Sequence, residues 1–295
     1  MRILVTVAHY WKPPPRWELM AERLGWRKLP HYGSTRPDAK ARIAALTQTI
    51  ANLHTLFVRP QALAGERPAT ANGSRTAELQ VIVCTDGKHH VLDSLGLPEN
   101  FFVQRASACD SKYLSFECQD VLREHLGRYD YYCYMEDDLA LHDPWFFEKL
   151  GWFRSQFGEE ALLQPNRYEL LYTAPVRKMY IDPVLAMGST SAYQDIRVDP
   201  LLTAPYLGGT VAFERCINPH SGCYFLSAAQ MEQWTRQPYF GERERCFVGP
   251  LESGATLGIM RTFKVYKPAI ADASFLEIEH PGDVYMRRFV TRWKL

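Results

Sequence analysis

Three short apolar segments, each followed closely by polar residues, constrain the fold of this chain more than any other feature. They are residues 2–8 (RILVTVA), 78–87 (ELQVIVCTDG) and 131–135 (YYCYM), and each is rich in β-branched or aromatic residues. Segments of this kind are typical of strands that are buried on both faces of a sheet. We therefore predict that they form neighbouring strands of one parallel sheet.

Amphipathic segments lie between these predicted strands. Residues 37–58 and 111–127 both carry apolar side chains at helical spacing, and Gly127 stands near the end of the second. Residues 60–77 are rich in Pro, Gly, Ala and Thr and are predicted to form a surface loop. Strands that alternate with helices indicate an α/β fold, with a mostly parallel central sheet flanked by helices.

The second half of the chain has a less regular pattern. Helices are predicted at 144–157 and 250–261, a strand at 262–268, and a strand that turns into a helix at 221–234. Residues 164–215 contain several prolines and a Gly-Gly pair, together with many Tyr, Leu and Met residues. This composition predicts an irregular insertion that covers a substrate, within a single domain of residues 1–295.

Composition excludes several classes of protein. The chain has 34 Lys and Arg against 33 Asp and Glu, so no basic field favours nucleic acid as a partner. Its 7 cysteines include no C-x-x-C pair, which argues against a zinc site and against a disulfide framework. No stretch approaches the roughly 20 apolar residues of a membrane span, and the first strand is too short for a signal peptide. We expect a cytoplasmic protein.

Three adjacent carboxylates, Glu136, Asp137 and Asp138, follow the third apolar segment directly. In an open α/β sheet, ligands bind just outside the carboxyl ends of the strands. Carboxylates at that position bind Mg²⁺ or Mn²⁺, and a cation with open positions can hold a nucleotide diphosphate and stabilise its departure. The plainer alternative is a solvated acidic turn, but adjacent carboxylates repel one another unless a cation neutralises them.

The segment EDDLALHDPWFFEKL, residues 136–150, resembles the metal-binding segment of the N-acetylglucosaminyltransferase I family. In that family too, E-D-D-L is followed by a pair of phenylalanines, as a DXD-like motif of the GT-A fold. The resemblance implies a GT-A-like fold, a nucleotide-sugar donor with a UDP-sugar favoured, and Mn²⁺ or Mg²⁺ as cofactor. It implies that Asp138 binds the metal, and that Glu136 and Asp137 hold metal-bound water or the ribose.

The broader GT-A pattern assigns further residues. It implies that His9 and Tyr10, at the end of the first strand, and Asp86, at the end of the second, contact the nucleotide. It also implies that His280 completes the metal site and that Glu252 is the catalytic base, although the second acid of the family's string is missing here. Each residue has a plainer interpretation: a turn cap for Asp86, a loop histidine for His280, and a residue that favours the helix dipole for Glu252.

These resemblances predict a metal-dependent glycosyltransferase of the hexosyltransferase class. Residues 1–143 would bind the nucleotide and residues 144–295 the acceptor, a glycan or lipid-linked precursor, with inversion at the anomeric carbon. One alternative is a noncatalytic carbohydrate-binding or scaffold protein that keeps the fold. Another is a nucleotidyltransferase, although residues 8–16 (AHYWKPPPR) lack the usual Gly-rich phosphate loop. A phosphoesterase or nuclease needs several separated acidic clusters, and the chain has one dense cluster.

The C-terminal segment combines basic and apolar residues. Arg287, Arg288, Arg292 and Lys294 alternate with Met, Phe, Val and Trp. Such a segment can lie on an anionic membrane, which would place the protein at the inner face of the membrane. The alternative is an ordinary terminal helix that packs on the domain.

Overall fold

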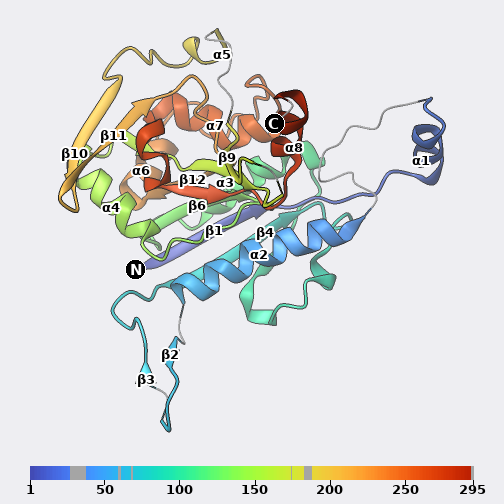
Figure 1. Cartoon of the computed structure of the whole chain (residues 1–295), viewed down its shortest axis with the longest axis horizontal. Helices are drawn as coiled ribbons and strands as arrows, with labels where there is room; N and C mark the ends of the chain where they lie inside the picture. The colour runs from blue at the N-terminus through green and yellow to red at the C-terminus, as the bar shows by residue number, and fades with distance from the viewer. Residues whose placement is uncertain (27–37, 59–60, 68, 174, 183–187, 294–295) are drawn as a thin grey trace.

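A five-stranded sheet with the order β12–β6–β1–β4–β5 lies at the centre of the protein (Figure 1). The computed structural model describes residues 1–26, 38–58, 61–67, 69–173, 175–182 and 188–293. The strands of this sheet are β1 (Arg2–Ala8), β4 (Glu78–Thr85), β5 (Val103–Ala106), β6 (Tyr131–Glu136) and β12 (Cys223–Ser227). All pairings are parallel except that of β12 with β6. The predicted α/β fold with a mostly parallel central sheet is therefore confirmed.

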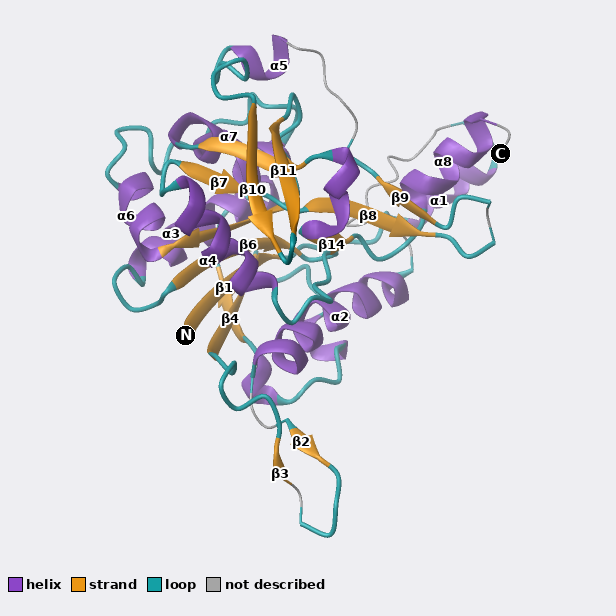
Figure 2. Cartoon of the chain, turned by 60° about the vertical axis from the view of Figure 1, so that its left-hand side comes forward, coloured by secondary structure: helices purple, strands orange, loops and turns teal. Residues whose placement is uncertain are grey.

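Helices cover both faces of this sheet (Figure 2). One face packs against α2 (Ala39–Phe57) and α4 (Phe146–Phe157), and the other against α3 (Leu114–Glu124), α6 (Ala228–Thr235) and α7 (Pro250–Thr262). Successive side chains of a strand point to opposite faces, so β1 sends alternate residues into two separate cores. Burial on both faces explains why its sequence is an unbroken apolar run.

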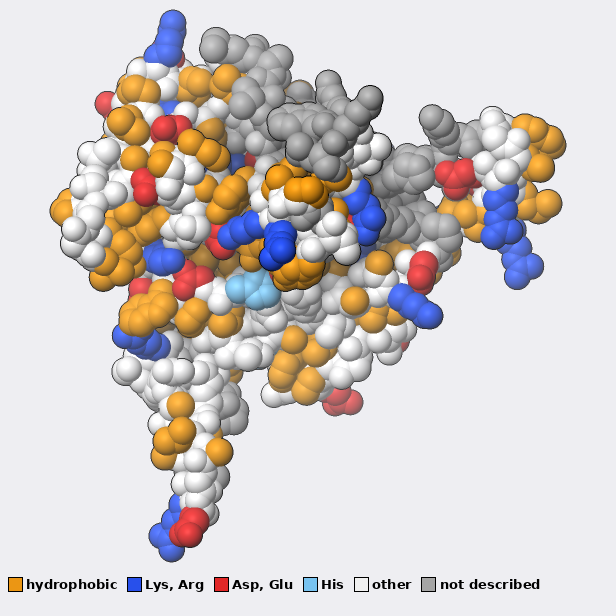
Figure 3. Space-filling model, in the orientation of Figure 1, with side chains coloured by type: hydrophobic (Ala, Val, Ile, Leu, Met, Phe, Trp, Pro, Cys, Tyr) orange, Lys and Arg blue, Asp and Glu red, His pale blue; other side chains and the backbone are white. Residues whose placement is uncertain are grey.

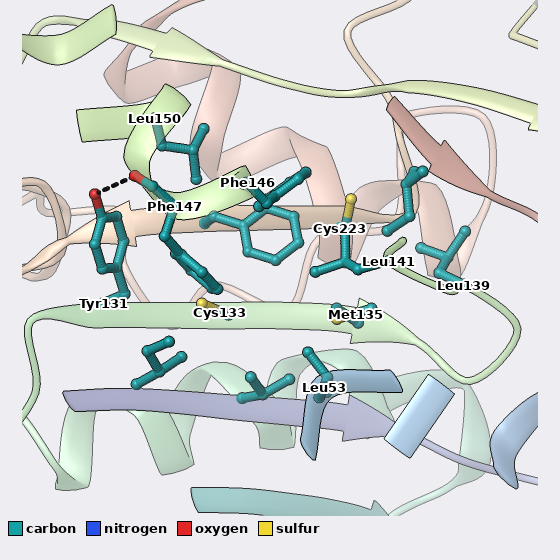
Figure 4. Packing of buried hydrophobic residues seen from close by; sticks show 14 of the residues in the cluster. Leu53, Tyr131, Cys133, Met135, Leu139, Leu141, Phe146, Phe147, Leu150 and Cys223 are labelled. Atoms are coloured by element: carbon teal, nitrogen blue, oxygen red, sulfur yellow. Dashed lines mark hydrogen bonds between the residues drawn. The ribbon is translucent and has the colours of Figure 1, made fainter. Parts of the chain in front are cut away.

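The core beside α4 fixes the strand that precedes the acidic residues (Figure 4). Cys133 and Met135 of β6 are fully buried, between Leu53 of α2 and the phenylalanines of α4. Phe146 and Phe147 are themselves buried, as expected for core residues. A strand packed this tightly holds the residues at its end in a defined position.

Several boundaries differ from the prediction. The helix predicted at 111–127 is shorter, because a 3-10 turn, η4 (Ser111–Tyr113), precedes α3. The loop predicted at 60–77 contains a small hairpin, β2 (Ala62–Leu63) and β3 (Ala69–Thr70). Glu136 is the last residue of β6 rather than the first residue after it. The described residues also form the 3-10 helices η2 (Leu92–Ser94), η3 (Glu99–Phe101) and η5 (Ile270–Phe275).

Several strands of two further sheets lie within 164–215, the segment that was predicted to be irregular, and its role in covering a substrate stays a prediction. The first has the order β14–β8–β9 and the second β10–β11–β13–β7. Their strands, with the short helix α5, are β7 (Ala161–Leu163), β8 (Asn166–Leu170), β9 (Lys178–Tyr180), α5 (Gly188–Ser191), β10 (Leu201–Tyr206), β11 (Gly209–Arg215), β13 (Lys264–Pro268) and β14 (Glu277–Glu279). Leu207 and Gly208 join β10 to β11 with φ of 47° and 81°, as in a type I′ turn. Leucine is rare at such a position, so the hairpin lacked its usual sequence signal.

The hairpin β2–β3 and one N-terminal helix project from the main body of the protein. The hairpin β2–β3 carries charged side chains at its tip, and α1 (Arg16–Arg23) carries the exposed Trp17 and Met20 (Figure 3). The last helix is α8 (Val284–Trp293). Lys294 and the side chain of Arg292, both part of the predicted basic segment, lie outside the described residues. Within the part of the chain that the structure describes, no helix is long and apolar enough to cross a membrane.

Candidate functional site

The carboxyl ends of β1, β4 and β6 meet at one edge of the central sheet. Ala8, the last residue of β1, pairs in register with Cys84 of β4 and with Glu136 of β6. The residues that follow these strands, including Tyr10, Asp86 and Asp138, are therefore gathered along this edge. This is the edge at which open α/β sheets bind their ligands.

Both carboxylate oxygens of Asp137 have partners within the protein. One carboxylate oxygen accepts from Nη1 of Arg42, and the other lies 2.5 Å from Nδ1 of His9. Nε2 of His9 accepts from the backbone N of Val91 at 3.1 Å, so Nδ1 is the nitrogen that donates to Asp137. His9 is completely buried and Asp137 is 7% exposed. Both residues thus support the edge of the sheet from inside.

Asp138 faces a more open space. Its side chain is 23% exposed, and its Oδ2 lies 3.2 Å from Nη1 of Arg42 and 3.7 Å from Nε2 of His280. Burial alone would raise the pKa of Asp138, but the positive charges of His280, Arg42 and Arg167 lower it below the ordinary value. The carboxylate is therefore kept ionised.

His280 is oriented by a buried carboxylate. Its Nδ1 lies 3.0 Å from Oε1 of Glu169, which is fully buried in β8. Burial opposes protonation of the imidazole, but the charge of Asp138 and the hydrogen bond to Glu169 outweigh it, so the pKa of His280 is raised. Because the carboxylate accepts from Nδ1, the ring turns Nε2 toward Asp138.

Glu136 points to a different set of partners. Its carboxylate lies 3.7 Å from Nη1 of Arg167 and 3.8 Å from Nε2 of His220. Burial raises the pKa of Glu136 to about 8; Arg167 opposes this shift, while the charges of Asp138 and Glu252 add to it. Glu252, in the first turn of α7, is thus within electrostatic range of the acidic residues.

A buried ion cluster supports Glu136 from behind. Arg167 and Lys267 both contact Asp182, with Nη2–Oδ1 and Nζ–Oδ2 distances of 2.7 Å. Lys267 also donates to the carbonyl oxygen of His220 at 2.6 Å. The cluster joins β8, β13 and the loop before β12, so three segments that are distant in sequence fix one side of the site.

Gly222 allows the loop before β12 to approach Glu136 closely. Its carbonyl accepts from the backbone N of Glu136 at 2.9 Å, and its φ is +64°. A Cβ at this position would lie 2.7 Å from Oε2 of Glu136. Glycine is therefore needed here both for the backbone conformation and for space.

Asp86 forms the turn that follows β4. Its Oδ1 accepts from the backbone N of Lys88 at 2.9 Å and of His89 at 2.7 Å, and its Oδ2 lies 2.6 Å from Nδ1 of His89. The plainer interpretation of Asp86, a turn cap, thus describes its contacts. The rings of Tyr10 and His89 lie beside it, with their centroids 5.5 Å apart. Direct contact of these residues with a nucleotide stays a prediction.

The structure brings Asp138 and His280 together, with the adjacent Glu136 under the electrostatic influence of Glu252. Sequence reasoning missed the residues that surround them. Arg42 had a signal, because it lies four residues before Leu46, on the apolar side of its predicted helix. Arg167, Glu169 and His89 had none. Arg167 and Glu169 lie in a short strand that pairs with the distant β14, and His89 lies in the turn that Asp86 forms after β4.

Asp138 and His280 could supply two ligands to a divalent cation whose other ligands do not come from the protein. Among the described residues, no group of three or more His, Cys, Asp or Glu could hold a metal ion. Asp138 and His280 nevertheless offer an oxygen and a nitrogen 3.7 Å apart. Two ligands of one ion at about 2.1 Å can be no more than about 4.2 Å apart, so this pair can share an ion. Phosphate oxygens and water would supply its remaining ligands.

Comparisons with known proteins yield structural likenesses alone. No protein-family model and no curated protein matches this sequence. The solved structure of CMP:2-keto-3-deoxy-manno-octonic acid synthetase complexed with CTP aligns with 100% of this chain and 99% of its own chain. The sequence identity is 11% and the TM-score 0.35, which is too low to support an inference about this chain.

Proposed function

We propose that this protein is a metal-dependent glycosyltransferase that moves a sugar from a nucleotide-sugar donor to an acceptor hydroxyl. The observation that carries the proposal is the Asp138–His280 pair at the carboxyl edge of β1, β4 and β6. One ionised carboxylate and one oriented imidazole face each other there at 3.7 Å. Arg42 contacts the carboxylate, and Glu169 contacts the imidazole.

Asp138 and His280 would hold Mn²⁺ or Mg²⁺, which when bound neutralises the diphosphate of the donor. Tyr10 and His89 lie at the ends of β1 and β4 and would contact the nucleotide, with Asp86 as their support. A UDP-sugar is the donor that the resemblance of residues 136–150 favours. Arg42 adds a fixed positive charge beside the cation-binding carboxylate.

Glu252 is the residue we propose as the general base toward the acceptor. It stands in the first turn of α7, and its charge acts on both Glu136 and Tyr285. A base that accepts the proton of the attacking hydroxyl contributes about 10²- to 10⁴-fold to the rate. Inversion at the anomeric carbon follows if the acceptor hydroxyl attacks from the face opposite the departing nucleoside diphosphate.

The binding test is calorimetric titration of UDP, GDP and CMP into the protein, with and without Mn²⁺. We expect one nucleotide to bind only with Mn²⁺, and Asp138→Ala to abolish that binding. Asp143→Ala is the matched control, because Asp143 follows the same strand but pairs with Lys149 at 2.6 Å. If the wild-type protein binds no nucleotide under any condition, the proposal is wrong and a noncatalytic scaffold becomes the better explanation.

The reaction test separates transfer from nucleotide-sugar synthesis. A nucleotidyltransferase would use the same edge of the sheet, so the products decide between the two. Release of nucleoside diphosphate from a nucleotide sugar, increased by an acceptor glycan, supports a glycosyltransferase. Release of pyrophosphate from a nucleoside triphosphate, when a sugar or a sugar 1-phosphate is supplied, contradicts it. Glu252→Gln should reduce the first reaction while the affinity for donor stays unchanged.

A further inference from the structure

The first turn of α8 lies against the candidate cation site. The ring of Tyr285 stands edge-on to the ring of His280, with centroids 5.6 Å apart. Met286 is completely buried and packs with Leu171, Met179 and Val290. This helix is thus docked on β8 and β9, with one of its side chains in the wall of the site.

Glu169 divides its two carboxylate oxygens between the site and this helix. Oε1 lies 3.0 Å from Nδ1 of His280, and Oε2 accepts from the backbone N of Met286 at 2.7 Å. The side chain is completely buried. Backbone N–H groups in the first turn of a helix have no partner within the helix, and a carboxylate there is favoured by the helix dipole.

Strand β8 also fixes the backbone of His280. The N–H of His280 donates to the carbonyl of Tyr168 at 2.8 Å, and Glu279 pairs with Tyr168 in register. Gly282, with φ of +123°, lies between the histidine and the helix. Glycine allows the chain to turn between His280 and Met286, the two residues that the Glu169 carboxylate contacts.

We propose that Glu169 is a positioning residue that couples the docking of α8 to the orientation of His280, so that α8 is part of the cation site. This inference rests on the proposed function, because it concerns the cation that Asp138 and His280 would share. Glu169 would not touch the cation or the substrate. It would act by keeping Nε2 of His280 directed toward Asp138.

The coupling must work in both directions. If a docked α8 favours cation binding through Glu169, a bound cation must favour the docked α8 by the same factor. Carboxylates that orient a metal-binding histidine typically change metal affinity by about 10- to 100-fold. A carboxylate with only a structural role would leave the cation and the helix independent of each other.

The first experiment measures this reciprocity in the unmodified protein. Backbone hydrogen exchange over residues 284–290 is compared for the protein with UDP alone and with UDP and Mn²⁺. We expect Mn²⁺ to slow exchange in this segment. If Mn²⁺ binds, as shown by its electron paramagnetic resonance signal, and exchange in α8 is unchanged, the coupling does not exist.

The second experiment uses Glu169→Gln. The amide presents one acceptor and one donor, so it cannot accept from both Nδ1 of His280 and the N–H of Met286. We expect the affinity for Mn²⁺ in the presence of UDP to fall by about 10- to 100-fold, and α8 exchange to lose its response to Mn²⁺. The control is Glu277→Gln, which removes a carboxylate of β14 that pairs with Lys178 rather than with His280.

The outcomes separate this inference from the proposed function. Wild-type affinity for Mn²⁺ in a folded Glu169→Gln overturns the coupling and leaves the glycosyltransferase proposal in place. If the wild-type protein itself binds no Mn²⁺ with any nucleotide, the cation site and the coupling both fail. Should Glu169→Gln not fold, the exchange measurement on the wild-type protein still decides.

Discussion

The two halves of the chain contribute to the site in different ways. The first half supplies the carboxylates, which stand at the end of a buried strand in a regular parallel sheet. The second half supplies most of the basic side chains that face them, Arg167, His280 and the neutral His220, from short strands and loops. The first half thus places the acids side by side. The second half determines that Glu136 lies against buried basic side chains, whereas Asp138 faces His280 and remains partly exposed.

Removing the centre of the buried ion cluster should have the largest effect. Asp182→Ala leaves Arg167 and Lys267 buried without their shared carboxylate, and we expect a loss of about 3–5 kcal/mol in the free energy of unfolding. Urea denaturation measures this loss. Asp195→Ala, at an exposed pair with Arg197, should change stability little. A similar small effect of both variants would mean that the second half does not depend on its cluster.

The same cluster predicts a dependence of stability on pH. Burial alone would raise the pKa of Asp182, but Arg167 and Lys267 hold it far below the unfolded value of about 3.9. Its contribution is therefore complete above that value and is lost as pH falls toward the folded pKa. In acid titrations followed by circular dichroism, Asp182→Asn should lose less stability than the wild-type protein below about pH 4. Parallel acid curves for the two proteins would contradict this.

The adjacent acids of the first half should separate binding from stability. Asp138→Asn should weaken Mn²⁺-dependent nucleotide binding by more than about 100-fold, because a direct ligand matters more than its supports. Its melting temperature should stay close to that of the wild-type protein. Asp137→Asn should instead lower the melting temperature, because Arg42 and His9 lose their shared partner. Calorimetry on both variants tests this, and equal effects on both quantities would remove the distinction.

Gly222 tests how closely the second half approaches the first. Gly222→Ala should cost about 1–3 kcal/mol from its positive φ, and more from the contact with Glu136. Gly208→Ala is a matched control, since Gly208 has φ of +81° and open space around its Cβ position. The difference between the two in thermal unfolding isolates the contact. Equal losses of stability in the two variants would show that the Glu136 side chain can move away from the added methyl group without destabilising the protein.

The smallest effect is expected at the turn after β4. Asp86→Asn keeps an acceptor for the backbone N–H groups but places an amide against Nδ1 of His89. We expect a loss of about 0.5–1.5 kcal/mol, that of one hydrogen bond. Chemical denaturation measures it, with Asp110→Asn at a second turn as control. A large loss of nucleotide affinity in a stable Asp86→Asn would mean that this carboxylate contacts the ligand itself.

The sequence by itself determined the parallel sheet, the helices beside it and the place of the acidic residues at its edge. Those features follow from local patterns, since the burial of β1, β4 and β6 on both faces requires unbroken apolar runs. The helix at 37–58 could be predicted from the helical spacing of its apolar residues, and α2 spans Ala39–Phe57.

Only the tertiary structure decided which partner each carboxylate has. Asp137 and Asp138 are adjacent and chemically alike, yet one is enclosed by His9 and Arg42 and the other faces His280. The strands within 164–215 were missed for a related reason: each is short, and several pair with strands distant in the sequence. Local patterns report which side of an element is buried, whereas ion pairs and strand pairings depend on which distant residues the packed chain brings within contact distance.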